Sequence, residues 1–485
     1  MMIFFCVFTL AACSVIDENA PAFPEDAAPP PPTPMEGVPQ PTALPARPQY
    51  GPGELVDYIA QTGDTLPALA VHFNTTVREI REANPTIPLD ATTMPPGMPM
   101  QIPIYYEPLW GTTYQMIPDS LFVNGPAQVG FDADEFVRSQ PGWFKLFHRY
   151  VNGAERYGGE LIDNIAVNYS VSPRLLLAIL EYQTGALTNP AAPDPEPRYP
   201  LGNLNPREQG YYNQLVYAAN TLNNGYYGWR LGTLRQFEHN DGRIERPDPW
   251  QNAATVAIQY YFASVLRDRD AFTQAIHAQG LVATYIRLFG DPWQNVQPHI
   301  PVSLTQPELR FPFSVGKSWA FTGGPHTNWG TGQPYTSLDF APPANTTGCQ
   351  VSEDFATAVA DGVIARKGNA LVELDLDGDG DIRTGWVIYY LHLANDGLIR
   401  QGAVVKAGDP LGHPSCEGGN ATGTHVHISR KYNGEWIPAD GVLAFDLEGW
   451  IAKAGAEPYQ GTLTRFSQTA TANTSGDSTT LVYSR

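Results

Sequence analysis

The sequence has little cysteine, few basic residues and no apolar run long enough to cross a membrane. Only 4 of its 485 residues are Cys, and 29 Lys and Arg stand against 49 Asp and Glu, which gives a formal net charge of -20. This balance argues against nucleic acid or an anionic membrane surface as a partner. The longest apolar stretch, near the N-terminus, has about a dozen residues and is too short to span a bilayer.

The length and the remaining composition indicate a globular protein of about three domains. Hydrophobic residues make up 42% of the chain, and 45 Gly, 45 Pro and 24 Tyr are typical of secreted or carbohydrate-facing proteins.

Residues 1–20 are predicted to be an export signal. The segment Leu10-Ala11-Ala12-Cys13 resembles a bacterial lipobox, although no Lys or Arg precedes the apolar run. The lipobox implies lipidation of Cys13 and a lipid-anchored protein of the cell envelope; the alternative is an ordinary signal peptide and secretion. Residues 21–53 are rich in proline and predict a semi-extended linker.

Outside the export segment, Cys349 and Cys416 are the remaining cysteines. An exported protein meets an oxidising compartment, which favours a disulfide between them. The alternative is two free thiols.

Residues 54–105 read as strand, helix, helix, strand. Thr62-Gly63-Asp64-Thr65 predicts a turn and a helix cap, and Asn84-Pro85 ends the second helix. This unit resembles a LysM module, a βααβ fold that binds N-acetylglucosamine-containing glycans. The resemblance places glycan contacts near Gly63, Asp64, Thr65, Asn84, Pro85 and Ile87. His72 is expected on an exposed helix face.

Residues 130–300 have apolar residues at helical spacing and predict a mostly α domain. The stretch LLLAILEYQTG resembles the start of lysozyme-like transglycosylase domains. Gln183 stands where those domains carry the catalytic Glu, and Glu181 lies two residues earlier. An amide cannot act as the general acid, so we expect no glycosidase activity here. The domain is then either a glycan-contacting unit or a helical spacer.

Residues 305–465 alternate in the period-two pattern of strands and predict an antiparallel all-β domain. Residues 466–485 are rich in Ser and Thr and are expected to be a mobile tail.

Three segments of this last region hold the residues that most strongly indicate chemistry. They are GGPHTNWGTGQPYTSLDFAPP, YLHL and GTHVHIS, which contain His326, Asp339, His392, His425 and His427. Imidazole nitrogens and a carboxylate are typical ligands of catalytic Zn²⁺. On strands, the polar residues would share one face while their apolar neighbours pack. No His-Glu-x-x-His helix is present, which excludes that kind of zinc site.

This set resembles the lysostaphin or LytM-like zinc metallopeptidases. Their common His-x-x-x-Asp pattern is missing, because Tyr335 stands four residues before Asp339. His326 lies thirteen residues before Asp339 instead, a spacing similar to that of the β-lytic (staphylolysin-like) branch.

The resemblance implies that His326, Asp339 and His427 bind zinc and that His392 and His425 act on water and the transition state. Tyr459 is a candidate for an assisting residue. The implied function is an exported cell-wall hydrolase, a zinc-dependent endopeptidase that cuts peptidoglycan stems or cross-bridges, with Gly-containing bonds expected. The alternative is a non-catalytic peptidoglycan-binding envelope protein that regulates another hydrolase.

The segment ELDLDGDGDIRTGW carries Asp375, Asp377, Asp379 and Asp381 at period two. It begins like a Ca²⁺-binding EF-hand loop, but Trp386 occupies the position of the final Glu. A solvated acidic turn is the favoured interpretation, and a weak Ca²⁺ site is the alternative.

Overall fold

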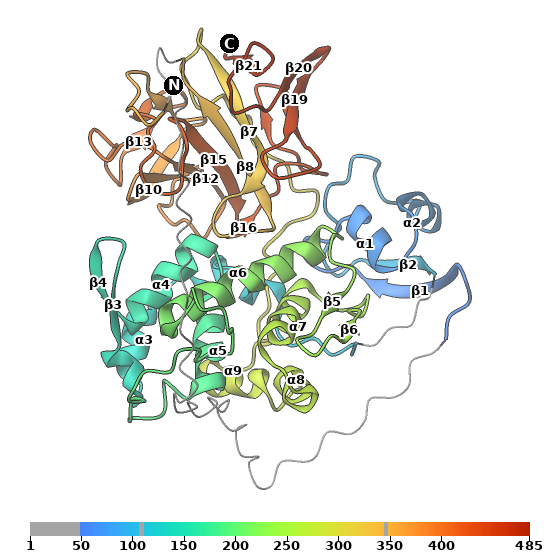
Figure 1. Ribbon diagram of the computed structural model, residues 1–485. Coiled ribbons are helices and arrows are strands. Elements are labelled where there is room, and N and C mark those ends of the chain that lie inside the picture. Colours follow the sequence, from blue (N-terminus) through green and yellow to red (C-terminus); the bar gives the residue numbers. More distant parts are fainter. Residues whose placement is uncertain (1–48, 106–110, 344–347) are drawn as a thin grey trace, which may run out of the picture. The chain divides into compact units, whose positions relative to one another are not determined.

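Figure 1 shows the computed structural model of the chain, which describes residues 49–105, 111–343 and 348–485. These residues all fall within one unit, residues 43–485. The predicted export signal with Cys13, and the linker as far as residue 48, lie outside the described residues. Within the described ranges, no helix is both long and apolar enough to cross a membrane.

The first described unit has the predicted βααβ order. Its elements are β1 (Glu54–Ile59), α1 (Leu66–His72), α2 (Val77–Ala83) and β2 (Pro99–Ile104). β1 and β2 pair antiparallel. Thr76 and Glu79 form a reciprocal capping box at the start of α2, which satisfies backbone N–H groups that the helix leaves unpaired.

His72 corrects one expectation, because it does not lie free on the surface. Its ring stacks on Trp229 with 3.6 Å between ring centroids, and its Nε2 lies 3.0 Å from the Trp229 carbonyl oxygen. Burial disfavours the imidazolium and lowers the pKa of His72 to about 3.

Helices occupy most of the middle of the chain. The helices are η1 (Asp119–Leu121), η2 (Pro126–Gln128), α3 (Ala133–Ser139), η3 (Trp143–Leu146), α4 (Gly158–Tyr169), α5 (Pro173–Thr184), α6 (Gly210–Arg230), α7 (Ala253–Val265), α8 (Arg269–Ile276) and α9 (Leu281–Phe289). Two hairpins accompany them, β3 (His148–Val151) with β4 (Ala154–Tyr157), and β5 (Phe237–Glu238) with β6 (Ile244–Glu245).

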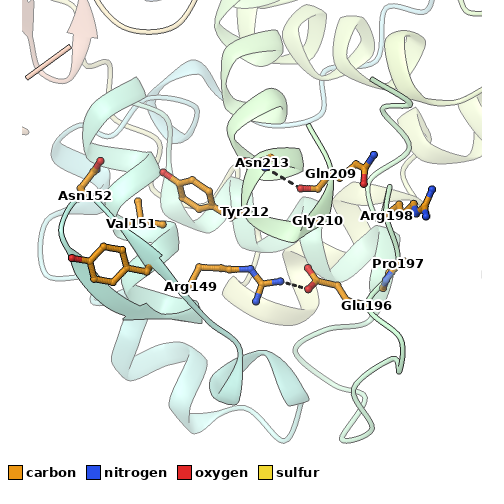
Figure 2. A pocket seen from close by; sticks show the side chains of 11 residues that line it. Arg149, Val151, Asn152, Glu196, Pro197, Arg198, Gln209, Gly210, Tyr212 and Asn213 are labelled. Atoms are coloured by element: carbon orange, nitrogen blue, oxygen red, sulfur yellow. Dashed lines mark hydrogen bonds and ion pairs between the residues drawn. The ribbon is translucent and has the colours of Figure 1, made fainter. Parts of the chain in front are cut away.

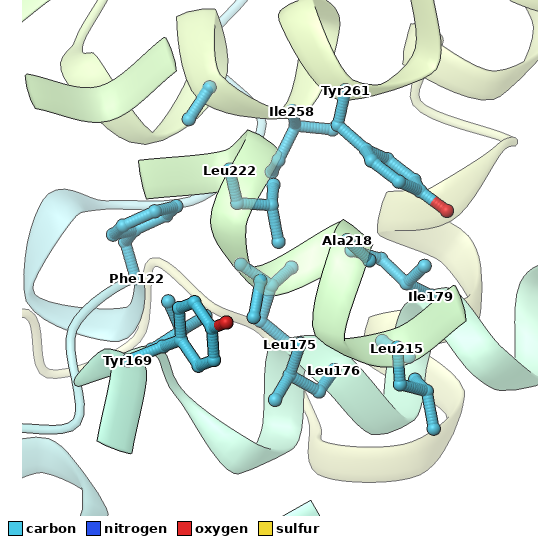
Figure 3. Packing of buried hydrophobic residues seen from close by; sticks show 14 of the residues in the cluster. Phe122, Tyr169, Leu175, Leu176, Ile179, Leu215, Ala218, Leu222, Ile258 and Tyr261 are labelled. Atoms are coloured by element: carbon cyan, nitrogen blue, oxygen red, sulfur yellow. The ribbon is translucent and has the colours of Figure 1, made fainter. Parts of the chain in front are cut away.

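The apolar faces of these helices meet in one buried cluster. Figure 3 shows Leu175 and Ile179 of α5 close to Leu215 and Leu222 of α6, with Ile258 of α7 on the far side of α6. Ser172 caps α5 by accepting a hydrogen bond from the Leu175 N–H, as its place before Pro173 indicates.

The C-terminal part is built on an antiparallel sheet of nine strands among the described residues. Their order is β13, β10, β11, β12, β15, β8, β7, β21, and β16 pairs with β15. The bounds are β7 (Ser318–Thr327), β8 (Tyr335–Ala341), β10 (Gly362–Gly368), β11 (Leu371–Asp375), β12 (Trp386–Leu391), β13 (Val404–Val405), β15 (Val426–Tyr432), β16 (Glu435–Trp436) and β21 (Leu481–Tyr483). This agrees with the antiparallel β prediction.

Two smaller sheets complete this part. β9 (Ala356–Thr357) pairs with β14 (Pro410–Gly412), and a second sheet runs in the order β17 (Asp446–Leu447), β18 (Trp450–Ala454), β19 (Gly461–Arg465) and β20 (Gln468–Thr471). The expected mobile tail over residues 466–485 is therefore wrong. β20 pairs with β19, and β21 forms the edge strand beside β7 with Val482 buried in the core.

A buried cluster of charges joins α6 to β16. Arg230 pairs with Asp119 at 3.5 Å and with Glu435 at 3.1 Å, and Glu435 also accepts hydrogen bonds from His299 and Tyr226. Burial alone would raise the pKa of Glu435, but Arg230 and His299 lower it to about 2. The ion pairs and hydrogen bonds offset the free-energy cost of burying these charges.

Candidate metal centre

Three neighbouring strands bring the predicted ligands together. Asp339 lies on β8, directly opposite His427 on β15, so both side chains lie on one face of the sheet. His326 lies near the end of β7, on the other side of β8, where the β7–β8 register is irregular. The structure therefore brings together His326, Asp339 and His427, the three residues that the family resemblance implied as ligands.

The distances between the facing atoms fit a single tetrahedral metal ion. His427 Nδ1 lies 3.0 Å from Asp339 Oδ1 and 3.1 Å from His326 Nε2, and His326 Nε2 lies 3.4 Å from Asp339 Oδ1. Zinc bonds of about 2.0–2.1 Å at tetrahedral angles would separate ligand atoms by about 3.3 Å. The donor set and its spacing therefore fit zinc with one position left for water or substrate.

The second nitrogen of each of these imidazoles is held by a carbonyl oxygen. His326 Nδ1 lies 2.7 Å from the Gly324 carbonyl oxygen, and His427 Nε2 lies 2.9 Å from Asn328 Oδ1. A carbonyl can only accept, so these nitrogens carry the proton. The facing nitrogens then present lone pairs to the site, which is the arrangement that orients metal-bound histidines.

The charges at the site are those that a cation requires. Burial opposes the Asp339 carboxylate, yet the His326 and His425 rings hold its pKa well below the usual range. Burial also lowers the pKa of His427 to about 4, so its ring is neutral at neutral pH. Asp339 and His427 are therefore in the protonation states that bind metal. Burial opposes protonation of His326, but the Asp339 carboxylate outweighs it and raises the pKa of His326, so metal competes with a proton at that ring.

His392 and His425 flank the three predicted ligands. As in the ligand histidines, one ring nitrogen of each is bonded to a carbonyl oxygen and the other is left free. Their Nδ1 atoms each lie 2.8 Å from a backbone carbonyl oxygen, of Glu417 and Gly423 respectively, which leaves both Nε2 atoms as acceptors. The two ring centroids are 4.5 Å apart, and His425 Nε2 lies 3.7 Å from Asp339 Oδ1.

Strand alternation does not explain the direction of His392, which corrects that part of the prediction. β12 ends at Leu391, and His392 has a φ of 65°, in the left-handed region. Such a conformation is uncommon for a residue other than glycine and often marks a functional site. The turn after the strand, rather than the strand itself, directs this side chain.

Asn328 is a site residue that the sequence prediction missed. Its Oδ1 accepts from His427 Nε2 and, at 2.8 Å, from the Ser429 hydroxyl. The side chain is buried. The available signal in the sequence was its place two residues after His326; in the structure it lies in the bend just after β7.

Gly323 makes room for the Asp339 carboxylate. A Cβ at this position would lie 2.3 Å from Asp339 Oδ2, so any other residue would push the carboxylate out of its present position. The Gly-Gly pair before His326 therefore has a steric role in the site.

Tyr459 lies next to His326, and Tyr335 does not take a ligand position. The Tyr459 and His326 rings stack with centroids 4.0 Å apart. Partial burial, together with the negative charge of Asp339, raises the pKa of Tyr459, so its hydroxyl can donate at neutral pH. Tyr335 begins β8 and pairs with Thr327.

The residues predicted to contact glycan mostly perform structural tasks in the βααβ unit. Gly63 has a φ of 74° and faces the Arg230 guanidinium, while Asp64 accepts hydrogen bonds from the Tyr58 hydroxyl and the Gln61 N–H. Thr65 caps α1, the Asn84 side chain is buried and ties α2 to β2, and Ile87 belongs to the core. Pro85 is exposed.

The acidic loop gathers three of its four aspartates. Carboxylate oxygens of Asp375, Asp377 and Asp379 lie within 4.8 Å of one another. Asp381 turns to Arg383 instead, with an Oδ2–Nη2 distance of 2.6 Å. Burial and the nearby Asp377 raise the pKa of Asp375 to about 6.

The remaining predicted residues have defined places. Cys349 and Cys416 form a disulfide with 5.4 Å between Cα atoms, which confirms the pairing. Glu181 is buried and accepts hydrogen bonds from the Leu187 N–H and the Thr188 hydroxyl. These contacts tie Glu181, on α5, to the segment that follows the helix and give it a structural role.

Comparison with known proteins agrees with this geometry. Residues 58–103 match the LysM domain, and residues 115–303 match the family described as LasA, N-terminal domain. Protease LasA of Pseudomonas aeruginosa is 28% identical over 348 residues, which cover 67% of this chain and 75% of the relative.

The C-terminal part has its own relatives. The β-lytic metalloendopeptidase of Lysobacter enzymogenes is 32% identical over 167 residues, which cover 33% of this chain and 86% of that protein. Among solved structures, the M23 metalloprotease pseudoalterin covers 35% of this chain and 96% of its own, with 25% identity and a TM-score of 0.30. On the sequence relationship and the His-Asp-His site, the chain is a LysM-containing member of the β-lytic metalloendopeptidases, as the spacing of His326 and Asp339 predicted.

Proposed function

We propose that the chain hydrolyses peptide bonds in the stems or cross-bridges of peptidoglycan, as a zinc-dependent endopeptidase that its LysM module holds on the cell wall. The observation that carries the proposal is the convergence of His326, Asp339 and His427 at tetrahedral spacing, with His392 and His425 beside them. A module held on glycan would raise the local concentration of substrate at the metal centre.

The roles of the side chains follow from their atoms. Zinc, when bound by His326, Asp339 and His427, would polarise a substrate carbonyl and lower the pKa of water. The free Nε2 of His392 or His425 is placed to accept a proton. Burial, followed by the neighbouring His425, lowers the pKa of His392, so that its ring is neutral and able to accept at neutral pH. The other histidine can donate a hydrogen bond to a developing oxyanion once its Nε2 is protonated, and the Tyr459 hydroxyl can donate one as it stands.

Several finer parts of the proposal rest on the sequence. We infer export to the cell envelope with a lipid anchor through Cys13. Glycan contact is proposed for the LysM loops around Gly63-Asp64-Thr65 and Asn84-Pro85 with Ile87. A weak Ca²⁺ site at Asp375, Asp377 and Asp379 is proposed without Asp381, because Arg383 already pairs with that carboxylate.

The rival function is a non-catalytic peptidoglycan-binding protein that regulates another hydrolase. The complete set of three predicted ligands and two further histidines supports the enzymatic function, because binding peptidoglycan alone does not require a metal centre with proton acceptors beside it. The helical part supports no glycosidase role, since Glu181 is buried on α5 and already bonded to the Leu187 N–H and the Thr188 hydroxyl.

The test is product analysis by mass spectrometry on defined cross-linked muropeptides, some with a direct link and some with a glycine bridge. Peptide cleavage should vanish with a zinc chelator and return with added zinc. The His425→Ala variant should keep its zinc but lose roughly 100-fold or more in kcat, and Asp339→Asn should lose zinc. A His277→Ala variant in the helical part serves as the control. Cleavage that survives chelation would contradict the proposal, and glycan cleavage by Asp339→Asn would point to the helical part.

A further inference from the structure

An open cavity of about 570 Å³ lies in the helical part, on elements that contribute nothing to the metal centre. The β3–β4 hairpin, the loop before α6 and the first turn of α6 line it (Figure 2). Its size lies within the range of ordinary small-ligand sites.

Two tyrosines give the cavity flat apolar surface. Tyr150 lies on β3 with 71% of its surface exposed, and Tyr212 lies half-buried on α6 and packs on the helical core. The hairpin ends in a tight turn in which Asn152 and Gly153 both have positive φ, at 51° and 81°, so the strand that carries Tyr150 is well defined. Tyrosine rings that are exposed to solvent, with an apolar face and a polar hydroxyl, are typical of recognition surfaces.

A fixed ion pair lies between the hairpin and the loop. Arg149 and Glu196 reach toward each other, with Tyr212 beside Arg149 (Figure 2). Glu196 also accepts a hydrogen bond from the Tyr211 N–H at the start of α6, and the Arg149 guanidinium lies 4.7 Å from the centroid of the Phe147 ring. A bound ligand would therefore meet donors and acceptors that are already in position.

The rim adds further polar groups without adding negative charge. The side chains of Asn152, Gln209 and Asn213 are exposed there. Arg198 also lines the cavity, and within the described part of the chain its guanidinium has neither a hydrogen bond nor an ion pair. In a chain with a formal net charge of -20, this lining has two Arg and one carboxylate.

We propose that this cavity binds a pyranose oligosaccharide and is a second glycan site of the chain, separate from the LysM module. Sugar rings have apolar C–H faces, which suit Tyr150 and Tyr212, and rims of hydroxyl groups, which suit the Arg149–Glu196 pair and the three amides. On the proposed function, on which this step rests, the natural ligand is the glycan strand of the cell wall. The cavity would then fix the strand while the metal centre acts on the attached peptide.

The experiment uses the full chain and a four-sugar oligomer of N-acetylglucosamine. Native mass spectrometry gives the number of bound ligands, and calorimetry gives their affinities. The Tyr150→Ala variant should bind one ligand fewer than the unaltered chain, or bind it about tenfold more weakly. Asn213→Ala, a milder change at an exposed residue, should weaken the same site. Tyr483→Ala removes another exposed tyrosine ring, on β21 and away from the cavity, and should leave sugar binding unchanged.

The outcomes separate this site from the proposed function. All variants are also assayed for cleavage of a glycan-free cross-linked peptide, which Tyr150→Ala should leave unchanged. Equal stoichiometry and affinity in the unaltered chain and both cavity variants would overturn the glycan site, even where cleavage is intact. Binding of free stem peptide rather than the oligosaccharide in this cavity would also overturn it. A wild-type chain that binds sugar but cleaves nothing would refute the peptidase proposal alone.

Discussion

At the metal centre each of the four histidines donates one ring N–H to a carbonyl oxygen and leaves the other nitrogen facing the site. For three of them the acceptor is a backbone carbonyl close by, of Gly324, Glu417 or Gly423. His427 alone depends on a side chain, that of Asn328. A side-chain acceptor can be removed by substitution, whereas a backbone carbonyl cannot, so the support of His427 by Asn328 can be tested directly.

Replacing Asn328 with Ala should weaken zinc binding by about 10–100-fold, because His427 would lose the acceptor that fixes its ring orientation and proton position. Competition with a chromogenic chelator measures this change directly, without a peptidase assay. Asn205→Ala, at an exposed asparagine of the helical part, is the matched control. Unchanged zinc affinity in Asn328→Ala would show that the ring is held without this amide.

Residue types, spacing and the family resemblance were sufficient to predict which three side chains converge, but not the residues that support them. The β-branched run around His425 and His427, and the thirteen-residue spacing from His326 to Asp339, are local features of the sequence. Asn328 acquires its role only through pairing of its hydrogen-bond acceptor with His427, 99 residues away. An asparagine in a glycine-rich segment is otherwise typical of a turn.

At the scale of elements, two segments outside the three ligand strands hold the site in shape. One is the loop around Cys416, which lies between Ser415, in a bridge with His425, and Glu417, whose carbonyl holds His392. The other is β21, which covers the edge of β7.

Replacing both Cys349 and Cys416 with Ser should lower the free energy of unfolding by about 2–5 kcal/mol, since the disulfide closes a 67-residue separation. The peptidase kcat should fall as well, because the Glu417 carbonyl would no longer be held beside His392. Chemical denaturation and the cleavage assay measure the two effects. A reductant should reproduce both in the unaltered chain and do nothing further to the double variant.

Neighbouring residues of β21 should differ strongly in how much a charge destabilises the fold. Val482→Asp places a carboxylate in the core and should cost about 3 kcal/mol or more of unfolding free energy, whereas Leu481→Asp points to solvent and should cost under about 1 kcal/mol. Thermal or urea denaturation distinguishes them. Two equally neutral variants would mean that the C-terminal segment does not form a strand.

The sequence prediction for residues 466–485 was wrong because it rested on amino-acid composition alone. Ser and Thr are abundant from residue 467 onward, and they are typical of mobile tails. The short apolar run Leu481-Val482-Tyr483 is too brief to predict a strand without a known partner. The partner strand, β7, lies about 160 residues earlier, and its backbone hydrogen bonds and side-chain contacts hold β21 as a strand.

At the scale of the whole molecule, buried polar contacts join units that were predicted separately. Arg230 of α6 reaches Glu435 of β16 and the Thr62 carbonyl of the βααβ unit. His72 of α1 stacks on Trp229. The sequence predicted the three units from local periodicity, but it gave no sign of these contacts between residues more than 150 positions apart.

His72 should make the stability of the protein depend on pH. The unfolded chain takes up a proton at His72 near pH 6.5, but the folded chain does so only near pH 3. The stabilisation is therefore complete above pH 6.5 and is lost as the pH falls toward 3. At pH 5 the loss is roughly 2 kcal/mol, at about 1.4 kcal/mol per pH unit.

The measurement compares urea denaturation of the unaltered chain and His72→Gln at pH 7.5 and pH 5. Taking the difference between the two proteins cancels the other titrating groups, and the unaltered chain should lose more stability on acidification. Parallel pH dependence in the two proteins would show that His72 titrates freely and is not held against Trp229.

The ligand strands also determine when in folding the metal centre can first exist. Asp339 and His427 are 88 positions apart, and His326 and His427 are 101 positions apart. Closing loops of this length is slow compared with forming local helices, so the three ligands meet only once β7, β8 and β15 have paired. A growing or partly folded chain accordingly has no assembled metal site. The protein therefore gains its peptidase activity only late in folding.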